Sequence, residues 1–307
     1  MKIWIAHPEG LPLMGPIPEQ AELSVLTAPD APLPGDPAQV EFWVPPFLAG
    51  GATTALLPRF TSLRVIQLLS AGADAWTAVV PDGVTLCDAR GVHDSSTAEW
   101  CVGAILSSLR RFDHLARTQA ERRWAYDDVV PTDELAGKRV LIIGAGSIGT
   151  ALARRLEPFE VSLTFVARRA REGVHGVDEL HRLLPEHDVV VLIVPLTPAT
   201  TGLVDKAFLA AMRDGALLVN AARGPVASTD ALTAEAATGR IWMALDVVDP
   251  EPLPSDHPLW TMTNVLITPH TAGSVRGVLR RGYALAGEQV RRFCAGVPLE
   301  NVVSDGY

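Results

Sequence analysis

Three side chains in the second half of the chain could together bind and protonate a carbonyl compound. Arg223, Glu251 and His270 each come shortly after an apolar run. Hydride transfer to a carbonyl carbon leaves charge on the oxygen, and a histidine can protonate that oxygen. A carboxylate can hold the imidazole ring and favour its charged form, and a guanidinium can bind a substrate carboxylate. Taken singly, each residue could equally be a surface charge or a turn residue.

A glycine-rich stretch supplies the strongest local signal. Residues 139–143 read as a strand that is apolar on both faces, and residues 151–156 follow with a helical pattern. Between them Gly144, Gly146 and Gly149 have the spacing G-x-G-x-x-G. These glycines allow a tight turn, a close backbone approach to a pyrophosphate and close packing of helix on strand. The helix N-terminus would then face the phosphates, so the stretch predicts a dinucleotide site.

Basic residues replace the acid that usually marks an NAD site. An Asp or Glu about 20 residues after the glycines normally binds the 2′-hydroxyl of the adenosine ribose. This chain has Arg168, Arg169 and Arg171 at that place and no acid. Because guanidinium groups suit a 2′-phosphate in charge and geometry, the sequence predicts NADP, with NADPH preferred over NADH. The alternative is a solvated basic loop.

Strands and helices alternate in a way that predicts an α/β protein of two domains. After residue 139, apolar runs alternate with helical patterns, which predicts a doubly wound parallel (Rossmann) sheet. The expected strands are 161–166, 188–194, 216–220, 243–247 and 265–267, with helices at 177–184, 206–212 and 229–238. A smaller α/β unit is expected before it, with strands at 2–6, 40–44, 64–69 and 84–87.

Two long helices should connect these domains. Residues 98–112 are expected to lead into the cofactor domain, and a helix from about 274 to 295 is expected to return the chain to the first domain. The predicted boundaries are therefore 1–95 with 275–307 for a discontinuous substrate domain. The dinucleotide-binding domain is expected at 96–274.

Composition restricts the possible partners. Of the 307 residues 48% are hydrophobic and 20% charged, so a large core is available. The net charge of −9 disfavours nucleic acid and anionic membranes. Three scattered cysteines do not suggest a disulfide framework or a metal site, and no apolar run is long enough for a membrane span. We therefore expect a cytoplasmic protein that binds neither nucleic acid nor membrane and holds no metal.

Four motifs in a fixed order give the chain a family resemblance. It resembles the NAD(P)-dependent D-2-hydroxyacid dehydrogenases over nearly its whole length, and most of all their glyoxylate/hydroxypyruvate reductase branch. The motifs are 144–149, 220–224, 246–253 and 268–273. Two departures are visible: the NAD-type acid is missing, and Val248 stands where the family often has an aromatic residue.

The resemblance implies roles for individual residues. It implies that Arg223 binds and polarises a 2-oxo acid, that His270 is the acid/base and that Glu251 pairs with His270. It implies that Asp246 holds the nicotinamide carboxamide. The further expected cofactor contacts are Ser147, Ile148, Pro195, Ala222 and Gly273.

The resemblance also extends to the smaller domain. It implies a flavodoxin-like fold in which the backbone of Ala71, Gly72 and Ala73 binds the substrate carboxylate. It further implies that Trp43 lies in a loop lining the substrate pocket, and that the protein is a homodimer built through the cofactor domain. His93 is interpreted as a structural residue.

The expected function is NADPH-dependent reduction of a small 2-oxo acid, such as glyoxylate or hydroxypyruvate, to the D-2-hydroxy acid. Two alternatives remain open. One keeps the architecture and reduces another substrate, for instance an imino acid. The other is a non-enzymatic cofactor-sensing scaffold, which an intact set of Arg223, Glu251 and His270 disfavours. Formate dehydrogenases are further relatives, but that branch lacks a glutamate in the role of Glu251.

Overall fold

The computed structural model describes residues 1–47 and 51–304, and the chain forms two compact units. One unit is Met1–His93 with Val275–Tyr307, which we call the small unit. The other is Asp94–Ser274, the large unit. The chain leaves the small unit at His93 and returns to it at Val275, so this unit is discontinuous in sequence.

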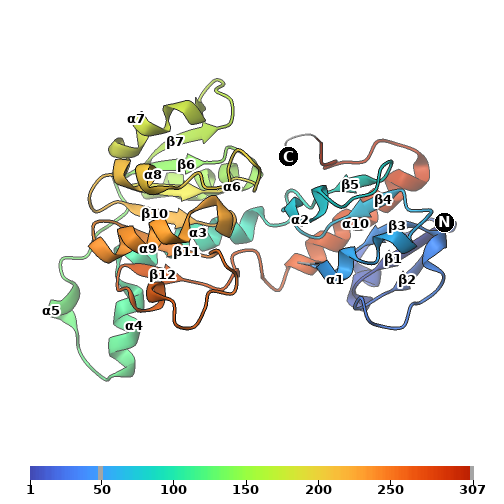
Figure 1. Ribbon diagram of the computed structural model, residues 1–307, viewed down its shortest axis with the longest axis horizontal. Helices are drawn as coiled ribbons and strands as arrows, with labels where there is room; N and C mark the ends of the chain where they lie inside the picture. The colour runs from blue at the N-terminus through green and yellow to red at the C-terminus, as the bar shows by residue number, and fades with distance from the viewer. Residues whose placement is uncertain (48–50, 305–307) are drawn as a thin grey trace. The chain divides into compact units, whose positions relative to one another are not determined.

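The small unit is built on a parallel sheet of five strands in the order β2-β1-β3-β4-β5 (Figure 1). The strands are β1 (Lys2–Ile5), β2 (Glu22–Val25), β3 (Val40–Val44), β4 (Val65–Gln67) and β5 (Thr85–Cys87). Helix α10 (Val278–Ala295) packs on one face through Tyr283, Ala286 and Val290. The other face is covered by side chains around Trp76, which belongs to the short helix α2 (Asp74–Thr77). A further short helix is α1 (Gly51–Thr54).

The large unit has a parallel sheet of seven strands in the order β12-β11-β10-β9-β6-β7-β8. The strands are β6 (Arg139–Ile143), β7 (Ser162–Ala167), β8 (His175–Gly176), β9 (Val189–Leu192), β10 (Leu217–Asn220), β11 (Trp242–Leu245) and β12 (Val265–Ile267). Successive side chains of a strand point to opposite faces, and in the central strands β6, β9 and β10 nearly all of them are buried, so both faces of the sheet are covered there. Leu141 and Ile143 face one hydrophobic cluster, and Val140 and Ile142 face the other.

Helices cover both faces of this sheet, as a doubly wound fold requires (Figure 1). The first cluster includes side chains of α7 (Leu180–Leu183), α8 (Lys206–Ala211) and α9 (Thr229–Thr238). The second includes side chains of α3 (Asp94–Leu109) and α6 (Ser147–Leu156). The predicted α/β class with parallel, doubly wound sheets is confirmed.

Short 3-10 helices occur in both units. Their bounds are Pro8–Leu13, Pro37–Gln39, Leu57–Arg59, Glu157–Phe159, Val177–Glu179, Leu184–Glu186, Gly224–Val226 and Pro258–Thr261. Among the helices of the described residues, none is both long and apolar enough to cross a bilayer.

The helix predicted at 98–112 ends earlier in the structure, and further short helices lie between it and β6. Helix α3 ends at Leu109, and α4 (Phe112–Ala120) and α5 (Tyr126–Val129) follow. The break lies at Arg111, whose φ of 56° is left-handed and whose guanidinium lies 4.4 Å from the ring centre of Trp242. The left-handed backbone of Arg111 separates α3 from α4, where the local pattern predicted one helix to residue 112. Figure 1 shows α4 and α5 at the margin of the large unit, outside the layers around the sheet.

Candidate active site

The glycine turn has the tight geometry that its spacing predicts. Gly144 has a φ of 125°, and a Cβ there would lie 2.0 Å from the carbonyl oxygen of Ile193. A Cβ at Gly149 would lie 2.1 Å from the carbonyl oxygen of Gly144. A Cβ at Gly146, in contrast, would meet no atom within 4 Å. Packing thus explains the first and third glycines, while the second borders open space where a pyrophosphate could approach the backbone.

The first turn of α6 is fixed by a contact with α3. Ser147, its first residue, donates a hydrogen bond from Oγ to Asp94 Oδ1 at 2.9 Å. The N–H groups at this helix end are the donors that suit phosphates. No sequence pattern indicates the pairing of Ser147 with Asp94, because the two residues lie far apart in the chain.

The basic loop after β7 reaches back to the glycine turn. Arg168, Arg169 and Arg171 are all exposed. Arg171 donates from Nη2 to the carbonyl oxygen of Ala145 at 3.1 Å, and its backbone exchanges two 2.9 Å hydrogen bonds with Val174. Arg171 therefore joins the predicted 2′-phosphate loop to the predicted pyrophosphate loop.

Asp246, directly after β11, organises the loop that carries His270. Its buried carboxylate accepts hydrogen bonds from Thr268 Oγ1 at 2.6 Å, from Thr271 N at 2.8 Å and from Ala272 N at 2.9 Å. The backbone N of His270 donates to the Asp246 carbonyl oxygen at 2.8 Å, and His270 itself has a left-handed φ of 53°. The carboxylate thus holds the Thr268 side chain before the histidine and the backbone N–H groups of the two residues after it. The role of Asp246 toward a nicotinamide stays a prediction.

Glu251 and His270 form a pair. His270 Nδ1 lies 2.6 Å from Glu251 Oε1, and the side chains are 27% and 41% exposed, respectively. With Nδ1 donating to the carboxylate, the other ring nitrogen, Nε2, is left for exchange of a proton with a substrate.

Arg223 follows β10 in a loop that packs against the segment leading to Glu251. Asn220 fixes this loop, since its Oδ1 accepts from Ala222 N at 3.1 Å. A Cβ at Gly224 would lie 1.9 Å from the carbonyl oxygen of Val248, so the two backbones are in close contact. The Arg223 guanidinium donates to the Ala222 carbonyl at 2.8 Å. The structure therefore brings the Arg223 loop, the Glu251 loop and the His270 loop to the carboxyl edge of neighbouring parallel strands, where ligands bind in this architecture.

The remaining predicted cofactor residues lie at the same edge, on loops or at the start of α6. Ile148 belongs to the first turn of α6, and Pro195 follows β9, with its carbonyl accepting from Thr200 Oγ1 at 2.6 Å. Ala222 is buried, and Gly273 follows the His270 loop. Their contacts with a cofactor stay predictions.

In the small unit, Ala71, Gly72 and Ala73 follow β4. Ser70 Oγ donates to the Gly72 carbonyl at 2.8 Å, which fixes this turn, and Ala73 is fully buried. His93 is buried, with Nε2 2.8 Å from the Leu69 carbonyl oxygen.

The placement predicted for Trp43 is wrong. Trp43 lies within strand β3 and is 1% exposed, with its ring stacked on Phe60 at 4.7 Å and edge-on to Trp76 at 5.6 Å. It is a core residue of the small unit because the alternation of β3 turns its side chain into the aromatic cluster and not into a loop.

A family model and known proteins match large parts of this chain. Residues 102–272 match the family model described as D-isomer specific 2-hydroxyacid dehydrogenase, NAD binding domain. A glyoxylate reductase from Thermofilum pendens is 36% identical over 245 residues, which are 75% of this chain and 71% of that protein.

Solved structures agree with this assignment. A D-isomer specific 2-hydroxyacid dehydrogenase from Xanthobacter autotrophicus, in complex with NADPH and MES, has a TM-score of 0.83 at 31% identity and 99% coverage of both chains. An NADPH-dependent glyoxylate/hydroxypyruvate reductase from Sinorhizobium meliloti, in complex with NADP and sulfate, has a TM-score of 0.81 at 25% identity, covering 99% of this chain and 98% of that one. The chain belongs to the D-isomer specific 2-hydroxyacid dehydrogenase family, and it is an enzyme of the nicotinamide-dependent dehydrogenase class.

Proposed function

We propose that the protein reduces a small 2-oxo acid, such as glyoxylate or hydroxypyruvate, to the D-2-hydroxy acid with NADPH. The observation that carries the proposal is the Glu251–His270 pair, at 2.6 Å, beside the Arg223 loop. A nicotinamide cofactor, when bound, supplies the hydride that the carbonyl carbon receives. His270 Nε2 gives the proton that the carbonyl oxygen takes up, and Glu251 stabilises the charged ring before transfer.

Arg223 and the turn after β4 are the proposed substrate contacts. The Arg223 guanidinium binds the carboxylate and polarises the carbonyl, since two N–H donors match a planar acid. The backbone N–H groups of Ala71, Gly72 and Ala73 are likewise proposed to bind a substrate carboxylate. Asp246, whose oxygens already hold the His270 loop, would contact the carboxamide of the nicotinamide.

The cofactor preference follows from charge. The fit of the glycine turn to a dinucleotide is supported by the open space beside Gly146. The preference for NADPH is supported by the exposed Arg168 and Arg169 at the end of β7, where an acid would repel a 2′-phosphate.

A cytoplasmic location is supported by the state of the thiols. Cys87 and Cys101 are buried and unpaired, and burial raises the pKa of the Cys87 thiol to about 12. Such thiols stay protonated and unreactive, and a reducing compartment suits them.

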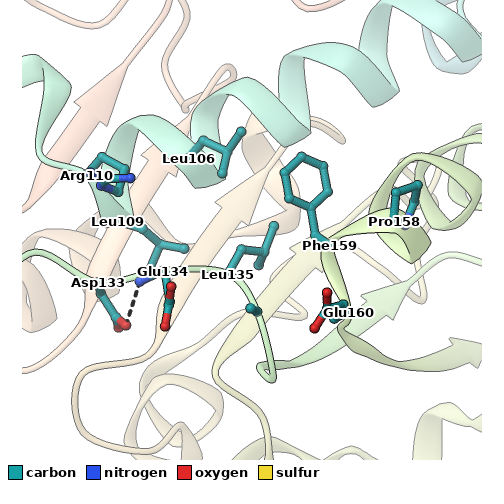
Figure 2. Close-up of a pocket in the computed structure, with 10 residues that line it drawn as sticks. Leu106, Leu109, Arg110, Asp133, Glu134, Leu135, Pro158, Phe159 and Glu160 are labelled. Atoms are coloured by element: carbon teal, nitrogen blue, oxygen red, sulfur yellow. Dashed lines mark hydrogen bonds between the residues drawn. The ribbon is translucent and has the colours of Figure 1, made fainter.

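A homodimer formed through the large unit is the proposed assembly. An apolar groove of about 320 Å³ lies between α3 and the loops before β6 and after α6, and Leu106, Leu109, Leu135 and Phe159 point toward it (Figure 2). Charged side chains, among them Arg110 and Glu160, stand at its rim (Figure 2).

The same unit carries an exposed apolar arm at α4 and α5. Phe112, Trp124 and Tyr126 are 54%, 94% and 62% exposed. In a two-fold dimer each copy can offer its arm and receive the other, which buries both apolar surfaces. We therefore assign the groove to a second copy of this chain.

The reaction is tested with a panel of 2-oxo acids offered with NADPH and with NADH, followed by the absorbance of the reduced nicotinamide. Consumption of NADPH with glyoxylate or hydroxypyruvate supports the proposal. A pyruvate–amine mixture tests the imino acid alternative. Tight NADPH binding without turnover on any of these compounds would favour the cofactor-sensing alternative.

A further inference from the structure

The hydroxyl group of Thr229, the first residue of α9, makes two hydrogen bonds with the backbone of Asp249. Thr229 Oγ1 donates to the Asp249 carbonyl at 2.5 Å, and Asp249 N donates back to Oγ1 at 3.3 Å. The helix does not need this hydroxyl for its own cap, because Ser228 Oγ accepts from Ala231 N at 3.3 Å. The Thr229 hydroxyl therefore bonds the loop after β11 and does not cap its own helix.

Asp249 stands two residues before Glu251 in a stiff segment. Pro250 and Pro252 flank the glutamate, and a proline ring fixes its own φ. Beyond them Leu253 is buried, at 8% exposure. With one end of the segment packed and its middle stiff, the position of Asp249 largely decides where the Glu251 side chain begins.

Glu251 needs such support because burial does not hold it. Its side chain is 41% exposed, yet its Oε1 lies 2.6 Å from His270 Nδ1. The histidine loop is tied separately, through Asp246. The loops of Glu251 and His270 are therefore held by different residues, the His270 loop by Asp246 and the Glu251 loop by Thr229.

We propose that Thr229 is a positioning residue for catalysis, which holds the Glu251 loop so that the carboxylate meets His270. The proposal rests on the function proposed above, because it presumes that the Glu251–His270 pair serves proton transfer. It concerns a residue that contacts neither ring nor carboxylate of the pair and acts through the backbone of Asp249 alone.

The test begins with Thr229→Val, which keeps the shape of the side chain and removes the hydroxyl. Loss of one such hydrogen-bonded support should lower kcat about 3- to 10-fold, while KM for NADPH changes less than about 2-fold. Thr229→Ser keeps the hydroxyl and should restore most of kcat. The matched control is Thr233→Val on the same helix. The Thr233 hydroxyl donates to the Thr229 carbonyl at 2.7 Å and not to the loop after β11, so this variant should leave kcat near the wild-type value.

A double-mutant cycle with Glu251→Gln then identifies the route of the effect. If Thr229 acts through Glu251, Thr229→Val should cost little further kcat in the Glu251→Gln background. Equal losses of kcat in both backgrounds, or no rescue by serine, would overturn the proposal. An inactive wild-type enzyme or a fully active His270→Ala variant would instead overturn the proposed function, so the two failures are distinguishable.

Discussion

His270 Nδ1 lies 2.6 Å from Glu251 Oε1, although the two residues come from loops after different strands. Each loop is fixed by its own backbone contacts, one through the Asp246 carboxylate and one through the Thr229 hydroxyl. The pair is therefore preorganised in the protein itself. Such preorganisation matters because small displacements at a reacting group cost large factors in rate.

The first prediction concerns the histidine. His270→Ala should lower kcat for reduction by about 10²- to 10⁴-fold, because the proposed proton donor is removed. NADPH binding, measured by quenching of tryptophan fluorescence, should stay close to the wild-type value. Near-normal turnover by this variant would show that the proposed acid is wrong.

The second prediction concerns the glutamate. In the proposed reduction His270 gives the proton, and the Glu251 carboxylate orients its ring through the 2.6 Å contact with Nδ1. Glu251→Gln should therefore lower kcat for reduction by about 10-fold or more, while NADPH binding stays close to the wild-type value. A near-normal kcat in this variant would show that the carboxylate does not serve the proton transfer. Glu235→Gln, which removes a carboxylate paired with Arg240 elsewhere in the large unit, is the control for loss of charge.

The third prediction concerns stability at mildly acidic pH. His187 is 3% exposed, with Nδ1 2.7 Å from the Leu183 carbonyl and Nε2 2.9 Å from Thr164 Oγ1, and burial lowers its pKa below the ordinary value of 6.5. The unfolded chain then takes up this proton at a higher pH than the folded chain does. The stability that neutral His187 contributes is thus fully present above about pH 6.5 and is lost as pH falls below it.

Urea unfolding between about pH 7.5 and pH 5.5 measures this effect. His187→Gln, which can still donate to Leu183 and accept from Thr164, should flatten the dependence of unfolding free energy on pH. His181→Gln, at an exposed histidine in the same unit, should leave the slope unchanged. Equal slopes in the wild type and the His187 variant would rule out this source of acid sensitivity.

The sequence predicted the fold where local patterns decide it. The apolar run of β6 and the glycines after it have the predicted geometry, because a strand buried on both faces and a turn without Cβ atoms are properties of the local chain. The edge strand β2 was missed, since its side chains are half-buried or exposed and give a weak pattern. Trp43 was misplaced because the family resemblance assigned it to a loop, although it lies within the strand predicted at 40–44. The packed aromatic cluster around Phe60 identifies it as a core residue.

The site was predictable to a similar degree. Residue types and motif order identified Glu251 and His270, which the structure brings into contact. The supports were not predictable: Thr229, Asp94 and the Ala145 carbonyl carry no sequence signal, because each meets its partner only after the sheet has formed. Backbone contacts between residues far apart in the chain produce no motif of fixed spacing in the sequence.

The fourth prediction concerns assembly. Trp124→Ser removes the most exposed of the arm's aromatic side chains, and it should shift the protein from dimer toward monomer in light scattering at micromolar concentration. Val177→Ser, at an apolar residue 40% exposed elsewhere on the large unit, should leave the mass unchanged. A wild-type protein with a monomer mass would refute the dimer, and an unchanged dimer in the Trp124 variant would remove the arm from the interface.

The last prediction separates the arginines of the basic loop. Arg168 and Arg169 are expected to meet the 2′-phosphate, which only NADPH carries. A hydrogen bond to a charged group contributes roughly 1.5–3 kcal/mol, so Arg168→Ala/Arg169→Ala should weaken NADPH binding by about 10- to 150-fold, or less if solvent screens the site. NADH binding should hardly change.

Arg171 has a different predicted role. It donates to the Ala145 carbonyl at 3.1 Å, and in a trans peptide this fixes the direction of the Gly146 N–H at the turn that both cofactors share. Arg171→Ala should therefore weaken the binding of NADH and of NADPH by a similar factor and leave the ratio of the two affinities unchanged.

The two roles are distinguished by measuring the affinity and kcat/KM for both cofactors, at saturating 2-oxo acid. A wild-type enzyme that prefers NADH, or a double variant with an unchanged cofactor ratio, would contradict the assignment of Arg168 and Arg169. A change of ratio in Arg171→Ala would place that guanidinium on the 2′-phosphate instead.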